Sequence, residues 1–104
     1  MKTKAEIEFN FEQARRRAAE LEEIAQDLES LAKRDMENTR AELAAAWKGE
    51  SAQLFCGKSD KLQQDIASTA KELAAVAGSI REIARLVYEA EMQALQIAAQ
   101  RDYV

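Results

Sequence analysis

Proline and histidine are absent from this sequence, and residues that form turns are scarce. The 104 residues include three glycines and one cysteine, and aromatic residues account for 6% of the chain. A chain with so few turn-forming residues can reverse direction at few points, which favours long helices. The single cysteine excludes an internal disulfide. The length is that of a single domain, expected to span residues 1–104.

An excess of positive charge is also missing. The chain has 15 Lys and Arg against 19 Asp and Glu, for a net charge of −4. Nucleic-acid binding depends on a clustered positive field, so we expect no nucleic-acid partner. No run approaches the roughly 20 apolar residues that span a bilayer, and the few aromatic residues give no sign of membrane insertion. The glutamates after the start disfavour a classical signal peptide, so we expect synthesis in the cytoplasm.

Apolar residues recur along both halves of the chain at alternating steps of three and four. In the first half the stripe runs from Phe11 to Ala32, and its frame drifts beyond Ala32. In the second half it runs without a break from Phe55 to Ile97, over about six heptads. Such a narrow stripe is typical of helices in coiled coils or bundles. The sequence therefore predicts an all-α fold.

The ends of the two helices follow from local signals. The first helix is expected at about 11–46, with Asn10 as its N-cap and an extended segment before it. A turn is expected at about 47–50 and the second helix at about 51–100. Gly49 is expected to end the first helix in a left-handed conformation, and Ser51 can cap the second. A connection this short predicts an antiparallel helical hairpin.

One hairpin is too small to cover its own apolar residues. In the first helix, Ile24 and Leu31 lie beside Leu21 and Leu28 and make the stripe too wide for one neighbour. A second hairpin would cover the remainder and give a four-helix bundle, formed by a second copy or by a paralogous chain. The expected core of hairpin and dimer consists of large apolar residues: Leu21, Ile24, Leu28, Leu31, Leu62, Ile66, Leu73, Val76, Ile80, Ile83 and Val87.

The predicted helices do not bring together the residues that catalysis or metal binding requires. Without histidine, Cys56 has no base to activate it, so it is expected as a small, partly buried apolar residue, with an intermolecular disulfide as the alternative. Carboxylates scatter over solvated helix faces, whereas acid–base catalysis needs two groups that converge in a cleft. We therefore expect no enzyme, no cofactor and no metal site.

A four-residue motif begins in the predicted turn and continues into the predicted second helix. Trp47, Gly49, Ala52 and Phe55 fit the pattern W-x-G-x-x-A-x-x-F. This pattern resembles the signature at the hairpin turn of the WXG family, which comprises hundred-residue proteins exported by the type VII (ESX) secretion systems of Gram-positive bacteria and mycobacteria. The length, the flanking helices and the central position of the motif fit the same family. The plain alternative is that Trp47 and Gly49 only close the end of a bundle.

The C-terminal export motif of the family is met only in part. It is usually Y-x-x-x-D/E, but Met92 stands four residues after Tyr88, so the literal motif fails. Glu91 does stand four residues after Val87. The resemblance therefore implies an export signal at Val87, Tyr88 and Glu91, with ordinary amphipathic helix residues as the alternative.

The resemblance implies a small secreted protein, of a kind associated with virulence, that leaves the cell as a folded dimer. Its partners would be a second copy or a paralogous hairpin, and the type VII secretion ATPase. The ATPase would recognise the turn motif of one chain beside the C-terminal signal of the other. The first alternative is a helical adaptor or chaperone for the N-terminal helical domain of a larger type VII toxin, because such a partner could supply the signal. The second is a cytosolic helical module in which W-x-G arose by chance.

Overall fold

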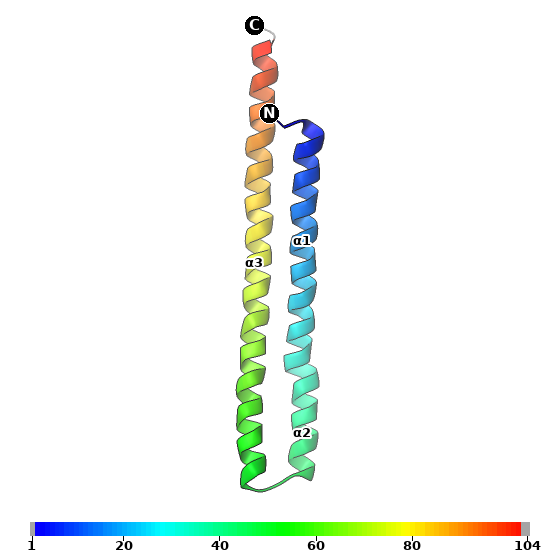
Figure 1. Cartoon of the computed structure of the whole chain (residues 1–104), viewed down its shortest axis with the longest axis vertical. Coiled ribbons are helices and arrows are strands. Elements are labelled where there is room, and N and C mark those ends of the chain that lie inside the picture. The colour runs from blue at the N-terminus through cyan, green and yellow to red at the C-terminus, as the bar shows by residue number, and fades with distance from the viewer. Residues whose placement is uncertain (1, 103–104) are drawn as a thin grey trace. The chain divides into compact units, whose positions relative to one another are not determined.

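The computed structural model describes residues 2–102, and these are helical apart from residues 2–3 and the turn. Helix α1 covers Lys4–Ser30 and continues through a π-helical segment, η1, at Leu31–Asp35 into α2 at Met36–Ala46. After the turn, α3 covers Glu50–Asp102. The all-α prediction is therefore confirmed, with two long helical arms in a hairpin-like arrangement (Figure 1).

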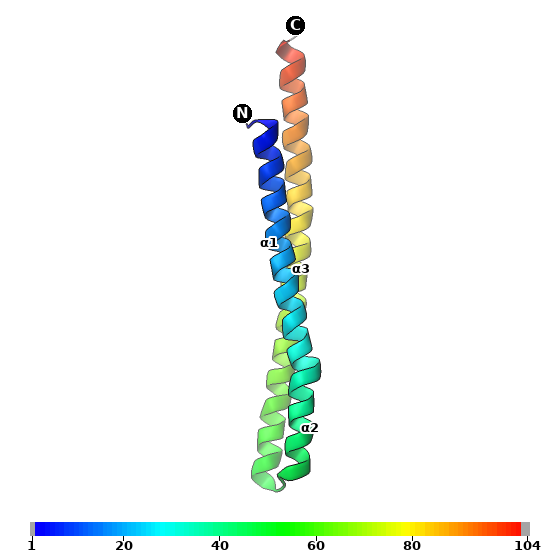
Figure 2. The ribbon, with the colours of Figure 1, turned by 90° about the vertical axis from the view of Figure 1, so that its right-hand side faces the viewer.

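Contacts between residues divide the chain into two compact units. One unit comprises Met1–Leu21 with Ala75–Val104, and the other comprises Glu22–Ala74. In the first unit, the start of α1 lies beside the second half of α3, as both views show (Figures 1 and 2). In the second unit, the end of α1, η1 and α2 lie beside the first half of α3 (Figures 1 and 2). The single-domain assignment over 1–104 stays a prediction.

The start of α1 differs from the sequence-based expectation. The helix begins at Lys4, so the predicted start after Asn10 and the extended segment before it are wrong. The Oγ1 atom of Thr3 accepts a hydrogen bond from the backbone N–H of Glu6 at 3.2 Å. Thr3 and Glu6 have the spacing of a capping box, which was the local signal for this helix start.

The segment before Asn10 was expected to be extended because Ile7, Phe9 and Phe11 alternate with polar residues, but helical spacing explains the same residues. Ile7 and Phe11 are four residues apart and share one helix face. Ile7 is buried, with 2% of its surface exposed, whereas Phe9 points elsewhere and is 60% exposed. A three-residue alternation is therefore too short to distinguish the two structures when a cap precedes it.

The most deeply buried positions of both units are small. Exposed fractions of 5% or less belong to Ile7, Ala18 and Ala77 in the first unit and to Ala25, Ala32, Ala52 and Ala70 in the second. We call these six alanines the alanine seam. A methyl side chain lets two helices approach closely, but it removes little apolar area from water. The contact between the two arms is therefore close and buries little hydrophobic surface.

The large apolar residues of the predicted core lie beside the alanine seam. Five are half-buried: Leu21, Leu28, Ile66, Leu73 and Ile80. Six keep between 39% and 60% of their surface exposed: Ile24, Leu31, Leu62, Val76, Ile83 and Val87. One chain alone does not bury these six residues, because alanines occupy the closest contacts between the arms. Their place in a dimer core stays a prediction.

A group of polar side chains joins α2 to α3 in the second unit. Arg40 forms ion pairs with Glu37, at 2.5 Å, and with Asp60. The amide of Gln63 donates to Glu37 at 3.1 Å. The hydrogen bond from Arg40, followed by that from Gln63, lowers the pKa of Glu37 from 4.5. The hydrogen bond to Glu37 and the charge of Asp60 raise the pKa of Arg40. We call these four residues the polar clamp.

The close contacts of the alanine seam predict that larger side chains at its buried positions destabilise the protein. Ala18→Leu should destabilise the protein by about 1–3 kcal/mol, because overpacking forces two close helices apart. Ala19→Leu is the matched control, since Ala19 is the neighbouring alanine on the exposed side of α1. Urea unfolding followed by circular dichroism compares the two variants. Equal stability of the two would contradict a close seam at Ala18.

The polar clamp predicts a loss of stability in acid. The pKa of Glu37 is lowered in the folded state, so its stabilising contribution is present above pH 4.5 and is lost as pH falls through the folded value. Hydrogen-bonded lysine and arginine partners lower the pKa values of Glu29 and Glu82 in the same way. The midpoint temperature of thermal unfolding should therefore decrease when the pH is lowered below 4.5. Glu37→Gln should reduce that fall, whereas Glu42→Gln, on the exposed side of α2, should leave it unchanged.

Candidate functional site

The turn between the arms is built by Trp47, Lys48 and Gly49. Trp47 has extended dihedral angles, and its N–H donates to the carbonyl of Leu43 at 2.7 Å, which ends α2. Gly49 has a φ of +114°, and its carbonyl accepts from the N–H of Gln53 at 3.1 Å. The left-handed glycine of the prediction is therefore present, but it lies directly before α3 instead of ending α2. The expected cap, Ser51, lies inside α3.

All four residues of the turn motif gather around this connection. The rings of Trp47 and Phe55 lie 5.6 Å apart, centroid to centroid, at 49°. Trp47 is 41% exposed and Phe55 is 46% exposed, whereas Ala52 is buried. Trp47, Gly49 and Ala52 line a hollow of about 250 Å³ together with Cys56, whose thiol is free and half-buried. The motif thus forms one exposed aromatic patch over a small buried residue.

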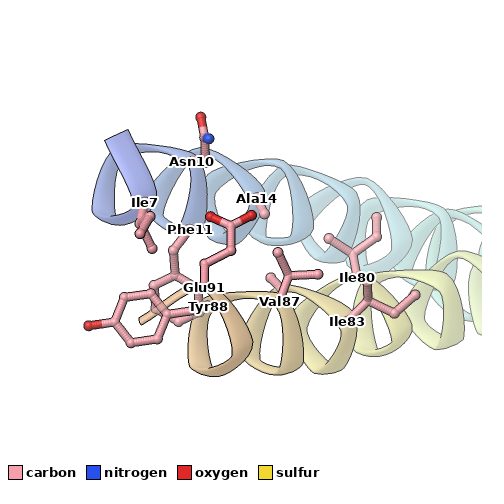
Figure 3. A pocket seen from close by; sticks show the side chains of 10 residues that line it. Ile7, Asn10, Phe11, Ala14, Ile80, Ile83, Val87, Tyr88 and Glu91 are labelled. Carbon is pink, nitrogen blue, oxygen red and sulfur yellow. The ribbon is translucent and has the colours of Figure 1, made fainter. Parts of the chain in front are cut away.

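The predicted C-terminal signal lies in the first unit, against the start of α1. The ring of Tyr88 lies 4.7 Å from that of Phe11, at 34° (Figure 3). The carboxylate of Glu91 forms an ion pair with the ammonium group of Lys2 at 3.1 Å. Val87 is about half exposed. Tyr88 and Glu91 are therefore both in contact with the N-terminal residues of their own chain.

An apolar groove runs beside this contact. Its volume is about 290 Å³. It lies between α1 and α3, with Tyr88 and Glu91 at one end and aliphatic side chains along the rest (Figure 3). The residues around it are Ile7, Asn10, Phe11, Ala14, Ile80, Ile83, Ala84, Val87, Tyr88 and Glu91. The groove is suited to contact with another apolar surface, because its walls carry almost no polar groups.

Two residues of this region, Lys2 and Phe11, were not predicted as partners of the C-terminal signal. Phe11 belongs to the first apolar stripe, which was a signal that it faces α3. Its pairing with Tyr88 depends on the register between segments far apart in the sequence. Lys2 gave no such signal, because a single exposed lysine has many carboxylates within reach.

Within residues 2–102, no group of three or more His, Cys, Asp or Glu side chains is arranged to hold a metal ion. No helix in the same range combines the length and the apolar composition that crossing a membrane requires.

A protein-family model matches residues 6–100, and the family is described as WXG100, proteins of 100 residues with WXG. The chain belongs to the WXG100 family. This family is associated with small helical proteins secreted by the type VII system and is not known for enzymatic activity. Comparison with curated proteins and with solved structures gives no match for the WXG100 chain.

The backbone of the WXG100 turn predicts opposite effects for two glycine substitutions. Gly49→Ala should destabilise the protein by about 1–3 kcal/mol, because a side chain is strained at this φ. Gly57 lies inside α3, and Gly57→Ala should stabilise by up to about 1 kcal/mol through helix propensity. A Cβ at either position meets no atom within 4 Å, so steric clashes do not contribute. Urea unfolding measures both, and the same sign for both would contradict the strained backbone at Gly49.

Proposed function

We propose that this WXG100 protein is a small secreted substrate of a type VII secretion system and is exported as a folded dimer. Its signal would combine the turn motif of one chain with Val87, Tyr88 and Glu91 of the other. The observation that carries this proposal is the family match over residues 6–100, with W-x-G in the connection between the two arms. The secretion ATPase would be the partner that recognises the combined surface.

A second copy of the chain is the proposed cover for the exposed apolar residues. Ile24, Leu31 and Leu62 are exposed in the second unit. Val76, Ile83 and the neighbouring Val87 are exposed in the first. Full burial of such a side chain is worth about 1.5–3 kcal/mol, so covering residues that are half exposed gains roughly half of that each. A paralogous hairpin with a similar face would serve equally.

The exposed aromatic pair is the proposed contact for the export machinery. Trp47 and Phe55 present large ring surfaces beside the turn, although a buried position would be more favourable for both. Tryptophan and tyrosine are enriched among the residues that dominate binding energy at protein interfaces. An exposed tryptophan on a rigid turn is therefore suited to recognition.

The adaptor role is the second candidate, and a specific observation favours it. Met92 replaces the acid of the usual C-terminal motif, and the nearby Glu91 is already paired with Lys2. A larger toxin with its own signal would make the incomplete one unnecessary. The two candidates differ in a simple respect: a substrate is exported with only a second copy or a paralogous hairpin as its partner, whereas an adaptor needs its toxin.

The export test compares two exposed aromatic residues. Trp47→Ala should lower the secreted fraction about tenfold or more, which corresponds to a loss of about 1.4 kcal/mol at the recognition surface. Phe9→Ala is the matched control, because Phe9 is exposed and far from the turn in sequence. Both variants and the parent chain are expressed in a bacterium with a type VII system, and the protein in medium and cells is quantified by immunoblot.

Circular dichroism confirms that each variant is helical before export is compared. Export of Trp47→Ala at the parent level would contradict the role of Trp47. If the parent chain stays in the cells unless a toxin is co-expressed, the result would favour the adaptor role.

A further inference from the structure

The first arm contains one irregular turn within an otherwise continuous helix. At η1, Leu31–Asp35, the N–H of Met36 bonds to the carbonyl of Leu31, five residues back instead of four. Ser30 and Met36, on either side, both have right-handed helical dihedral angles. The helix is therefore not broken, and η1 is a π-bulge, the form in which a helix accommodates an extra residue.

Burial shows what the bulge does to the register of the arm. Before it, the residues that face α3 follow steps of three and four, through Ala25, Leu28 and Ala32. Continued from Ala32, the same steps would bring residues 35, 39 and 42 to this face, but all three are exposed. The less exposed residues are Met36, Arg40 and Leu43 instead. Each is displaced by one residue from the regular pattern.

The displaced residues make the contacts that join α2 to α3. Arg40 reaches Asp60 and holds Glu37, which accepts from Gln63. At the end of the same helix, Trp47 meets Phe55. A regular helix of the same sequence would turn α2 by about 100° about its axis relative to α1. Arg40 and Trp47 would then be turned away from their contacts with Asp60 and Phe55 on α3.

We propose that η1 is an absorbed one-residue insertion and the positioning element of the turn motif. It keeps the face of α2 that contacts α3 on the same side of the arm as the alanines of the seam that lie in α1. One exposed residue of the bulge is therefore surplus: its removal converts the π turn into a regular α turn and leaves Met36, Arg40, Leu43 and Trp47 on the face that they already occupy. This inference depends on helix register alone and is independent of export.

The test is deletion of Arg34, an exposed residue of the bulge. The side chain of Arg34 forms an ion pair with the adjacent residue, Asp35. Without Arg34, Met36 follows Ala32 at a step of three, and the regular pattern is restored. The shortened chain should have the same helix content as the parent. Its melting temperature should be no more than about 5 °C lower than that of the parent, which corresponds to a stability change of about 1 kcal/mol. Trp47 is the only tryptophan, so its emission maximum, expected to be unchanged, reports the turn directly.

The matched control is deletion of Arg17, which removes the same exposed residue type from a regular part of α1. No bulge is nearby to absorb that change, so residues on one side of the deletion leave the face toward α3. The melting temperature should fall by more than about 10 °C. Arg34→Ala keeps the length, separates the loss of charge from the loss of a residue, and should resemble the parent.

A double-mutant cycle adds a readout that stability alone does not give. The coupling between Arg40→Ala and Asp60→Ala should be the same with and without Arg34, because the polar clamp is kept in both. The proposal is overturned if deletion of Arg34 lowers the melting temperature as much as deletion of Arg17. It is also overturned if the Trp47 emission shifts, if the coupling disappears, or if both deletions are tolerated equally.

Discussion

The six alanines of the alanine seam occupy the closest contacts between the helices of each unit. Methyl groups at the buried positions allow the helices of each unit to approach closely, and they leave no room for larger side chains between them. Each buried methyl or methylene group is worth about 0.8 kcal/mol, so the seam alone gives limited stability. The leucines, isoleucines and valines beside it lie toward solvent. Six of them keep between 39% and 60% of their surface exposed. This exposure is the basis for the proposal that a second chain covers these residues.

The same constraint explains how the candidate sites are presented. Ala52 is buried under the turn, and the rings of Trp47 and Phe55 contact each other at a tilted angle at the surface. At the other end of α3, Tyr88 and Glu91 contact Phe11 and Lys2. The residues of the two proposed recognition sites are therefore held by contacts within the chain, while the large aliphatic residues beside the seam stay exposed.

Much of the fold follows from the sequence, and the errors have physical causes. The helices, the turn and the W-x-G motif were predictable, because heptad spacing and the scarcity of glycine allow one reversal of direction. Three alanines of the seam, Ala18, Ala25 and Ala32, belong to the stripe predicted for the first helix. The three in the second helix were missed because large apolar residues dominate a hydrophobicity pattern, although alanines lie directly beside them. The π-bulge was visible only as a drift beyond Ala32, since the extra residue has no side-chain signature. The pairing of Phe11 with Tyr88 depends on the register of distant segments, which one sequence does not specify.

The central claim is that the exposed apolar residues belong to an interface with a second chain. The solution mass of the purified protein, measured by size exclusion with light scattering, tests it most directly, with helicity recorded on the same sample. We predict a helical species at twice the 11.6 kDa mass of one chain. A stable, fully helical monomer of 11.6 kDa at the same concentration would contradict the account.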